Sequence, residues 1–324
     1  MDTHPQAGHP FYRFAVALNV PVPEPLPIPS DEDELADLAL SEQVLAHARK
    51  SKLGPASSPA LSLRILQLVA DPSADAAALS QVITADPALA AGLLNVANSV
   101  ANRGTVEIET VRDAVARLGL AEVGRVAGAL SAKSLFNPKL KSERHAFADG
   151  FHALYLRAIT IATAAGNFAM RVPGARPDRA YLGGMLHDVG RSVALRAVSM
   201  LALDGQLAIA PDDPRLARVI DRVHVPLGGE VHQEWQLPQY LTDLAALHHE
   251  RTVPEGPEFV DLHVVRLVAA VHDLRNDLSV AVRAADEVLQ SATALHLRES
   301  EVRSIGGELK LAEEHAQKLA GAAK

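Results

Sequence analysis

The sequence contains no cysteine and few aromatic residues. Aromatic side chains make up 4% of the 324 residues, and only one of them is tryptophan. The lack of cysteine excludes disulfides and thiolate-bound metals and fits a reducing compartment. Basic stripes interleaved with aromatic residues, which are typical of surfaces that bind nucleic acids, are also missing.

An excess of positive charge and long apolar runs are absent as well. The chain has 31 Lys and Arg against 39 Asp and Glu, which gives a net charge of -8. Bulk electrostatics therefore do not attract it to nucleic acid or to anionic membranes. No apolar stretch approaches the roughly 20 residues that span a bilayer, and the run from Phe14 to Leu18 is too short for a signal peptide. We expect a cytoplasmic protein that binds neither nucleic acid nor membrane.

Proline is concentrated near the N-terminus, where it occupies every second position from Pro21 to Pro29. This spacing forbids a helix and favours an extended chain. Residues 1–30 are therefore predicted to form a disordered segment that serves as a spacer or as a docking peptide. Ser30, followed by the acidic residues Asp31 to Glu34, predicts a capped helix over 31–52.

Capping residues and proline divide the rest of the chain into helical segments. Asp86-Pro87 is an N-cap followed by proline at the first helical position, and Thr110 and Asp113 have the spacing of a capping box. No segment shows the alternation of apolar and polar residues that is typical of a strand. The sequence therefore predicts an all-α fold. Amphipathic helices over 276–324 either close off the core or form the contact of a homo-oligomer.

His187 and Asp188 end a small apolar run that begins at Tyr181. An adjacent imidazole and carboxylate can bind one hard or borderline cation, and Gly190 would let the backbone turn so that both side chains face one cavity. Two further histidine motifs follow, His224-Val-Pro-Leu-Gly228 and His248-His249-Glu250. A His-Asp pair alone is a weak motif in a chain with 14 histidines, but the ordered set of three is more specific.

This order of motifs resembles the HD phosphohydrolase superfamily. Upstream, Asp86-Pro-Ala-Leu89 and Leu94-Asn-Val-Ala-Asn-Ser99 resemble the N-terminal part of an HDOD domain, an output domain related to the metal-dependent HD hydrolases. The resemblance covers about 53–275. It implies a multi-helix HD-like bundle in two lobes, about 53–137 and 138–275, with a cleft near the histidine motifs. Asn95 and Asn98 alone indicate only side chains that bond the next loop.

The superfamily pattern also implies a histidine from the helix before His-Asp and an aspartate from a later helix. When Phe151 and Ala158 are placed at the family's aromatic and alanine positions, the histidine position falls on Ala153. His152 is one residue away, a rotation of about 100° on a helix, and is a weaker alternative ligand. The aspartate position falls near Ala270, three residues before Asp273.

Two outer ligands are therefore missing, and His187, Asp188, His224 and His248 are predicted to be a vestigial metal site. Loss of a carboxylate weakens the binding of a hard ion, so no cofactor is expected beyond a weakly bound divalent metal. The Gly-Tyr-Pro motif of the cyclic-dinucleotide hydrolases is also replaced, by residues 251–257.

The resemblance to HDOD domains then implies a bacterial signal-transduction or regulatory module that is not an enzyme. Such a module would act through contacts with proteins of a signalling pathway. The alternative is a divergent metal-dependent phosphohydrolase or phosphodiesterase of the HD superfamily, using the same residues with His152.

Overall fold

The computed structural model describes residues 30–51, 64–65, 68, 75–99, 102, 107–136, 147–277 and 280–322. Within these ranges the regular structure is helical and contains no strand. The predicted all-α fold class is therefore confirmed. The predicted proline-rich segment lies outside the described residues, except for Ser30 at its end.

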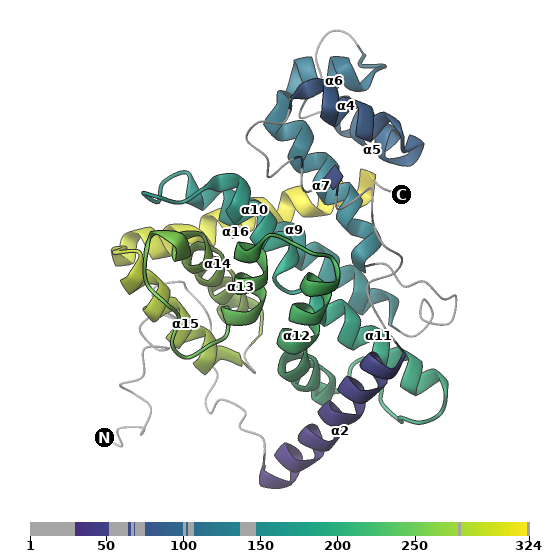
Figure 1. Cartoon of the computed structure of the whole chain (residues 1–324), viewed down its shortest axis with the longest axis vertical. Coiled ribbons are helices and arrows are strands. Elements are labelled where there is room, and N and C mark those ends of the chain that lie inside the picture. The colour runs from purple at the N-terminus through teal and green to yellow at the C-terminus, as the bar shows by residue number, and fades with distance from the viewer. Residues whose placement is uncertain are drawn as a thin grey trace.

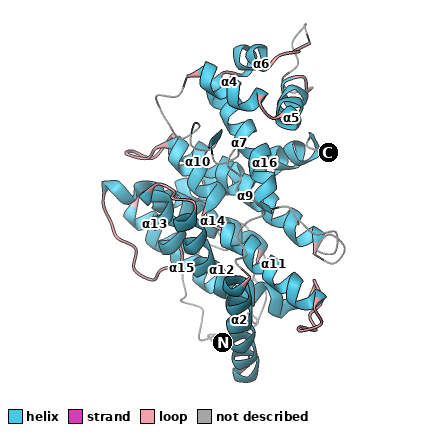
Figure 2. Ribbon diagram, turned by 45° about the vertical axis from the view of Figure 1, so that its right-hand side comes forward, coloured by secondary structure: helices cyan, strands magenta, loops and turns pink. Residues whose placement is uncertain are grey.

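The described helices form two lobes (Figures 1 and 2). The smaller lobe contains α4 to α7, and the larger one is built around α9 and contains the helices that follow it, with α2 along its far end. In chain order the elements are α2 (Asp31–Lys50), α4 (Ala76–Thr84), α5 (Pro87–Ala97), α6 (Val111–Leu118), α7 (Leu120–Phe136), α9 (Ala148–Ala169), α10 (Pro177–Leu186), α11 (Val189–Leu203), α12 (Pro214–Glu234), α13 (Gln239–Leu247), the 3-10 helix η1 (Pro257–Phe259), α14 (Val260–Asn276), α15 (Ala281–Ala294) and α16 (Glu299–Ala322).

Side-chain caps begin several helices where the sequence predicts them. The Ser30 hydroxyl accepts a hydrogen bond from Asp33 N, and the Asp33 carboxylate accepts one from Ser30 N, which completes a capping box at α2. Thr110 accepts from Asp113 N at α6 in the same way. The Asn98 side-chain amide donates through Nδ2 to the Ile108 carbonyl oxygen and accepts at Oδ1 from Ile108 N, at 2.8 Å each, so its predicted role in holding the next loop is confirmed. Asn95, in contrast, is exposed.

Helix α12 contains a proline in its interior. It runs without interruption through Pro226 to Glu234. Proline removes one backbone hydrogen bond and crowds the carbonyl four residues earlier. Here Pro226 is on the exposed side of the helix, while Val223 and Leu227 on either side are buried. Burial of the apolar face therefore keeps the two halves in one helix that carries His224 in its middle.

Helix α9 contributes to each of the three hydrophobic cores found in the described residues. Its first turns, at Phe151, pack with α2, α11 and α12. Its middle, at Tyr155 and Ala158, packs with the small lobe, and its last turns, at Ala165 and Phe168, pack with α14, α15 and α16. Helix α9 thus links the three cores.

The C-terminal helix α16 belongs to two of these cores. Ile305 and Leu309 are buried with α14 and α15, whereas Ala316 and Leu319 are buried in the core of the small lobe. Of the two interpretations of the C-terminal segment, closing off the core is the one that this packing supports.

None of the described helices is long and apolar enough by itself to cross a membrane. One bent pair, Ala76–Thr84 with Leu89–Ala97, meets the test by length and composition alone.

Two leucines of α16 provide a test of this packing. Leu309 is fully buried and Leu311 is 64% exposed. We expect Leu309→Ala to lower the free energy of unfolding by about 2–5 kcal/mol, because it leaves a cavity in the core. Leu311→Ala should change it by no more than about 0.5 kcal/mol. Urea denaturation of both variants measures the difference, and equal effects would mean that α16 does not pack as described.

Candidate functional site

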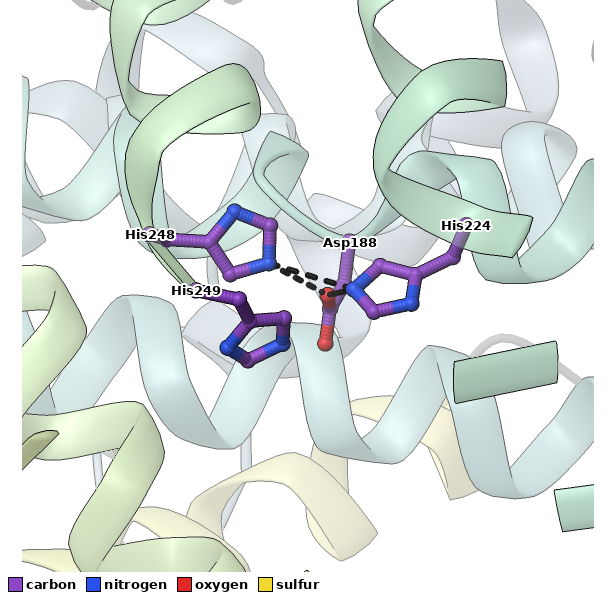
Figure 3. A group of neighbouring side chains, drawn as sticks. All are labelled: Asp188, His224, His248 and His249. Carbon is purple, nitrogen blue, oxygen red and sulfur yellow. Dashed lines mark hydrogen bonds and ion pairs between the residues drawn. The ribbon is translucent and has the colours of Figure 1, made fainter. Parts of the chain in front are cut away.

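His187 and Asp188 form the turn between α10 and α11, and both side chains are buried. Oδ1 of Asp188 lies 3.2 Å from Nε2 of His224 on α12 and 3.4 Å from Nε2 of His248 after α13. Figure 3 shows the two rings pointing at the carboxylate, with His249 beside them. One ligand atom from each of Asp188, His224, His248 and His249 lies within 4.8 Å of the others. This cluster could hold a metal ion.

A close approach of two helices brings His224 to Asp188. A Cβ atom at Gly190 would lie 1.9 Å from the His224 carbonyl oxygen and 2.6 Å from the Gly228 nitrogen. Gly190 is inside α11 and does not have a positive φ. The predicted role of Gly190 in a backbone turn is therefore wrong: its missing side chain lets α11 contact α12.

His187 is buried beside this cluster but is not part of it. Its Nδ1 is 3.0 Å from the Gly184 carbonyl oxygen, and its Nε2 is 3.4 Å from Oδ2 of Asp188. This Nε2 has no hydrogen-bond partner, although it is buried. His152, the weaker candidate, is exposed on α9 and does not join the cluster.

The histidines do not line the open cleft that the resemblance implied. His187, His224 and His248 are exposed by no more than 1%. A fourth histidine, His232, is also buried and lies between two backbone carbonyls, with its ring nitrogens 3.1 Å from the oxygens of Leu186 and Leu241. The motifs thus meet inside the larger lobe instead of at a surface between the lobes.

Two arginines that the sequence-based prediction missed contact the same carboxylate. Nε of Arg157 and Nε of Arg191 donate to Oδ2 of Asp188 at 2.9 and 3.0 Å. Arg157 also donates through Nη1 to Asp273, so its guanidinium group joins carboxylates from two different helices. Arg191 is three residues after Asp188, a spacing at which helical side chains meet. Arg157 comes from α9, and no local pattern indicates the contact.

The ion pairs continue beyond Asp188 into a chain of alternating charges. Nη2 of Arg191 donates to Asp221 at 2.8 Å, and Nη2 of Arg283 donates to the same oxygen at 2.9 Å. Arg283 then donates to Glu287 at 3.0 Å, and Nδ1 of His249 lies 2.8 Å from that carboxylate. Largely buried charges are tolerated only when they are paired in this way.

A metal ion would have to share Asp188 with the two guanidinium groups. Three imidazoles and one carboxylate suit a borderline ion such as zinc by donor type. Oδ2 of Asp188, however, already accepts from both Arg157 and Arg191. Only Oδ1 remains for an ion, and two fixed positive charges lie next to it. The donor atoms of the cluster thus suit a divalent ion, but the positive charges of Arg157 and Arg191 disfavour its binding.

The family model of the HDOD domain matches residues 56–251 of the sequence. The chain belongs to the HDOD family. The match covers the small lobe and α9 to α13 of the larger lobe, while α2 lies before it and η1 and α14 to α16 lie beyond it.

Solved structures with a similar fold agree with this assignment. A candidate metal-dependent phosphohydrolase from Shewanella amazonensis SB2B has a TM-score of 0.54 and 17% identity, with 83% of this chain and 99% of that chain covered. A candidate signal-transduction protein from Marinobacter aquaeolei VT8 has a TM-score of 0.61 and 22% identity, with 89% and 66% covered. An HDOD domain protein of unknown function from Geobacter sulfurreducens has a TM-score of 0.53 and 21% identity, with 83% and 98% covered. Among curated proteins, none matches significantly.

Burial and neighbouring charges shift the pKa values of Asp188, His187 and His224. Burial raises the pKa of Asp188, but the charges of Arg191 and Arg157 outweigh it and hold the pKa well below its usual range. Burial also lowers the pKa of His187 to about 3 and the pKa of His224 to about 4. At neutral pH the carboxylate is therefore ionised and these two rings are neutral.

These shifts predict that the protein loses stability in acid. An unfolded histidine takes up a proton below its usual pKa of about 6.5, whereas folded His187 and His224 remain neutral down to about 3 and 4. Between pH 6.5 and 4 the unfolded chain thus binds more protons than the folded protein, so the fraction of unfolded protein rises as the pH falls. We expect a loss on the order of 2 kcal/mol for each ring, measured by urea denaturation at pH 7 and 4.5.

Single substitutions separate this effect from general acid denaturation. His187→Gln removes one buried ring and should reduce the loss between pH 7 and 4.5. His152→Gln removes an exposed ring and should leave the loss unchanged. The same pH dependence in wild type and His187→Gln would contradict the assignment of a buried neutral imidazole.

The contact between α11 and α12 gives a second prediction, with a neighbouring glycine as its control. Gly190→Ala should destabilise the protein by about 3 kcal/mol or more, because backbone atoms of α12 occupy the space of the new methyl group. A Cβ added at Gly229, also on α12, would meet nothing within 4 Å, so Gly229→Ala should be neutral or stabilise by up to about 1 kcal/mol. Thermal denaturation of the pair checks the contact, and a neutral Gly190→Ala would disprove it.

Proposed function

We propose that this HDOD protein is a non-catalytic regulatory module that acts through contacts with other proteins. The observation that supports this most is the state of Asp188. Its side chain is buried and is paired with Arg157 and Arg191. A carboxylate held in this way stabilises the fold and has little capacity left to bind a catalytic ion.

The arrangement of α9 and α14 supports the same proposal. The position on α9 that the superfamily pattern assigns to a histidine is Ala153, which is exposed. One turn later, Arg157 is the residue of α9 that contacts Asp188. On α14, Asp273 is buried and paired with the same arginine. A guanidinium group therefore joins two carboxylates, as a metal ion would, but it offers no coordination position for water.

The similar fold of the candidate signal-transduction protein from Marinobacter aquaeolei VT8 agrees with a regulatory role. The partners would be proteins of a signalling pathway. Helix α2 lies before the matched family domain and carries two exposed leucines, Leu35 and Leu38. Exposed apolar side chains of this kind are compatible with a protein contact.

A second candidate function is metal-dependent phosphohydrolysis. The cluster of Asp188, His224, His248 and His249 favours it, as does the buried Nε2 of His187, which has no hydrogen-bond partner. Hydrolysis would require an ion that keeps an open position and lowers the pKa of its bound water to about 7. The adjacent guanidinium groups would weaken the binding of such an ion, so we rank this function second.

Thermal denaturation with added metal separates the two functions. In the regulatory module, manganese, magnesium or ferrous ions should not raise the melting temperature of untagged protein, and no phosphodiester should be hydrolysed above background. Asp188→Ala should lower the free energy of unfolding by about 3–5 kcal/mol, because it leaves two buried arginines without their shared partner. A tightly bound catalytic ion would instead stabilise the wild type by mass action.

A double-mutant cycle identifies the origin of the loss. If Asp188 acts through its ion pair, Asp188→Ala and Arg157→Ala should be strongly non-additive. Asp188→Asn, which keeps the size and removes the charge, should also be destabilising. Stoichiometric metal retained through purification, together with hydrolysis that His187→Ala and Asp188→Ala abolish, would refute the regulatory function.

A further inference from the structure

Helix α2 carries apolar residues on two opposite faces. The face that is buried in the core with α11 and α12 carries Leu40, Val44 and Ala48. The face that is exposed carries Leu35, Leu38, Ala39 and Ala46. At about 100° per residue, the two sets lie on opposite sides of the helix. A surface helix that only packs on its own core needs one apolar face, so the second face indicates a further contact.

Ion pairs with α12 hold α2 in place with its second apolar face outward. Arg222 donates to Glu34 near the start of α2 at 2.8 Å, and Arg49 near its end donates to Glu230 at 2.7 Å. A third pair between them involves the buried Asp37. Figures 1 and 2 show α2 at the end of the larger lobe that is away from the small lobe. A helix that is positioned beforehand pays less conformational entropy when it binds a partner.

Opposite charges lie at the two ends of this outward face. Glu32 is exposed in the first turn of α2, and Lys50 is exposed in the last turn. Both lie within about 60° of the centre of the exposed apolar face. A second α2 in antiparallel orientation would place the acidic end of each helix beside the basic end of the other, whereas a parallel one would bring like charges together. The face is therefore complementary to itself, as the interface of a two-fold dimer must be.

The spacing of the residues defines how two copies of α2 would align. With the two-fold axis near residues 40 and 41, Leu35 of each copy lies beside Ala46 of the other, and Glu32 lies beside Lys50. The small side chain of Ala46 lets the two helix axes approach to about 8–10 Å. Glu42 is also exposed on this face. In this alignment its two copies lie near the axis and repel each other, which weakens the contact.

We propose that the protein forms a homodimer through antiparallel contact of α2 with the α2 of a second copy. The exposed leucines of each helix pack on the alanines of the other, and Glu32 pairs with Lys50 at both ends. The contact face of the 20-residue helix is about 30 Å long and 10 Å wide. It is smaller than the roughly 800 Å² per partner of a standard interface, so we expect a weak dimer with a Kd on the order of 10 μM.

Sedimentation equilibrium of the full-length protein measures this association directly. We expect a reversible equilibrium between monomer and dimer at micromolar concentrations. Leu35→Glu should weaken the dimer by about tenfold or more, because it places a carboxylate in the apolar contact. Leu311→Glu is the matched control, since Leu311 on α16 is 64% exposed and Leu35 is 70% exposed. It should leave the Kd of the dimer unchanged.

Reversal of single charges tests the antiparallel orientation. At low ionic strength, Glu32→Lys and Lys50→Glu should each weaken the dimer by about fivefold or more, and the double variant should restore the wild-type Kd. In a parallel dimer each single reversal would exchange one pair of like charges for another and change the Kd little. Glu42→Gln should strengthen the antiparallel dimer, because it removes the repulsion near the axis.

Cysteine cross-linking tests the same alignment by a second route, because the chain has no cysteine of its own. Leu35→Cys and Ala46→Cys should each fail to form disulfide-linked dimers alone, since the two copies of either residue are about 16 Å apart along the helix axes. That separation is too large for a disulfide. An oxidised mixture of the two variants should form cross-linked dimers that contain one chain of each.

Three results would overturn the proposal. The first is a wild-type protein that remains monomeric at submillimolar concentration. The second is a dimer whose Kd is the same in the wild type and in Leu35→Glu, which would place the contact on another surface. The third is cross-linking of Leu35→Cys alone with none between the two cysteine variants. These measurements involve no metal, phosphodiester or partner protein, so the dimer and the regulatory function can fail independently.

Discussion

The Asp188 carboxylate, held between two guanidinium groups, is the interaction on which the rest of the larger lobe depends. Arg157 brings α9 to it and Arg191 extends it to α12. Beyond α12, Arg283 carries the alternation of charges to Glu287 on α15. Asp188 and Glu287 are buried, so removal of an arginine partner leaves a desolvated charge behind. Helices far apart in sequence are thereby fixed to one another by charge, in addition to the apolar contacts of α9.

Backbone geometry makes this arrangement of charges possible. Gly190 and Gly228 let α11 and α12 cross without side chains between them, which places His224 against Asp188. The buried face of α12 keeps the helix continuous through Pro226. His187 and His224 are neutral because burial lowers their pKa, so the fixed positive charge next to Asp188 comes from the arginines. The site therefore combines a cluster of possible metal ligands with the fixed positive charges of two buried arginines.

The sequence predicts the fold better than it predicts the site. Local signals such as Ser30, Asp86 and Thr110 indicate helix starts because a cap depends on residues three positions apart. The meeting of Asp188, His224 and His248 follows from the order of the motifs and their family resemblance. Arg157 and Asp273 escape this reasoning because their pairing joins α9 to α14 across more than 100 residues. Whether His152 is buried or exposed depends on which face of α9 points toward the core. The sequence around His152 leaves this register uncertain by one residue.

An internal guanidinium group and a bound metal ion satisfy the same carboxylates with different chemical consequences. Both neutralise charge and both hold helices together, so either allows the same fold to be stable. A metal ion can exchange its water ligands and activate one of them, whereas a guanidinium group has only fixed N–H donors and no open coordination position. With Arg157 joining Asp188 and Asp273, the stabilising part of the ion's role is supplied by the chain itself. In the proposed regulatory module, this pairing would hold the helices around the His-Asp motif together without a catalytic ion.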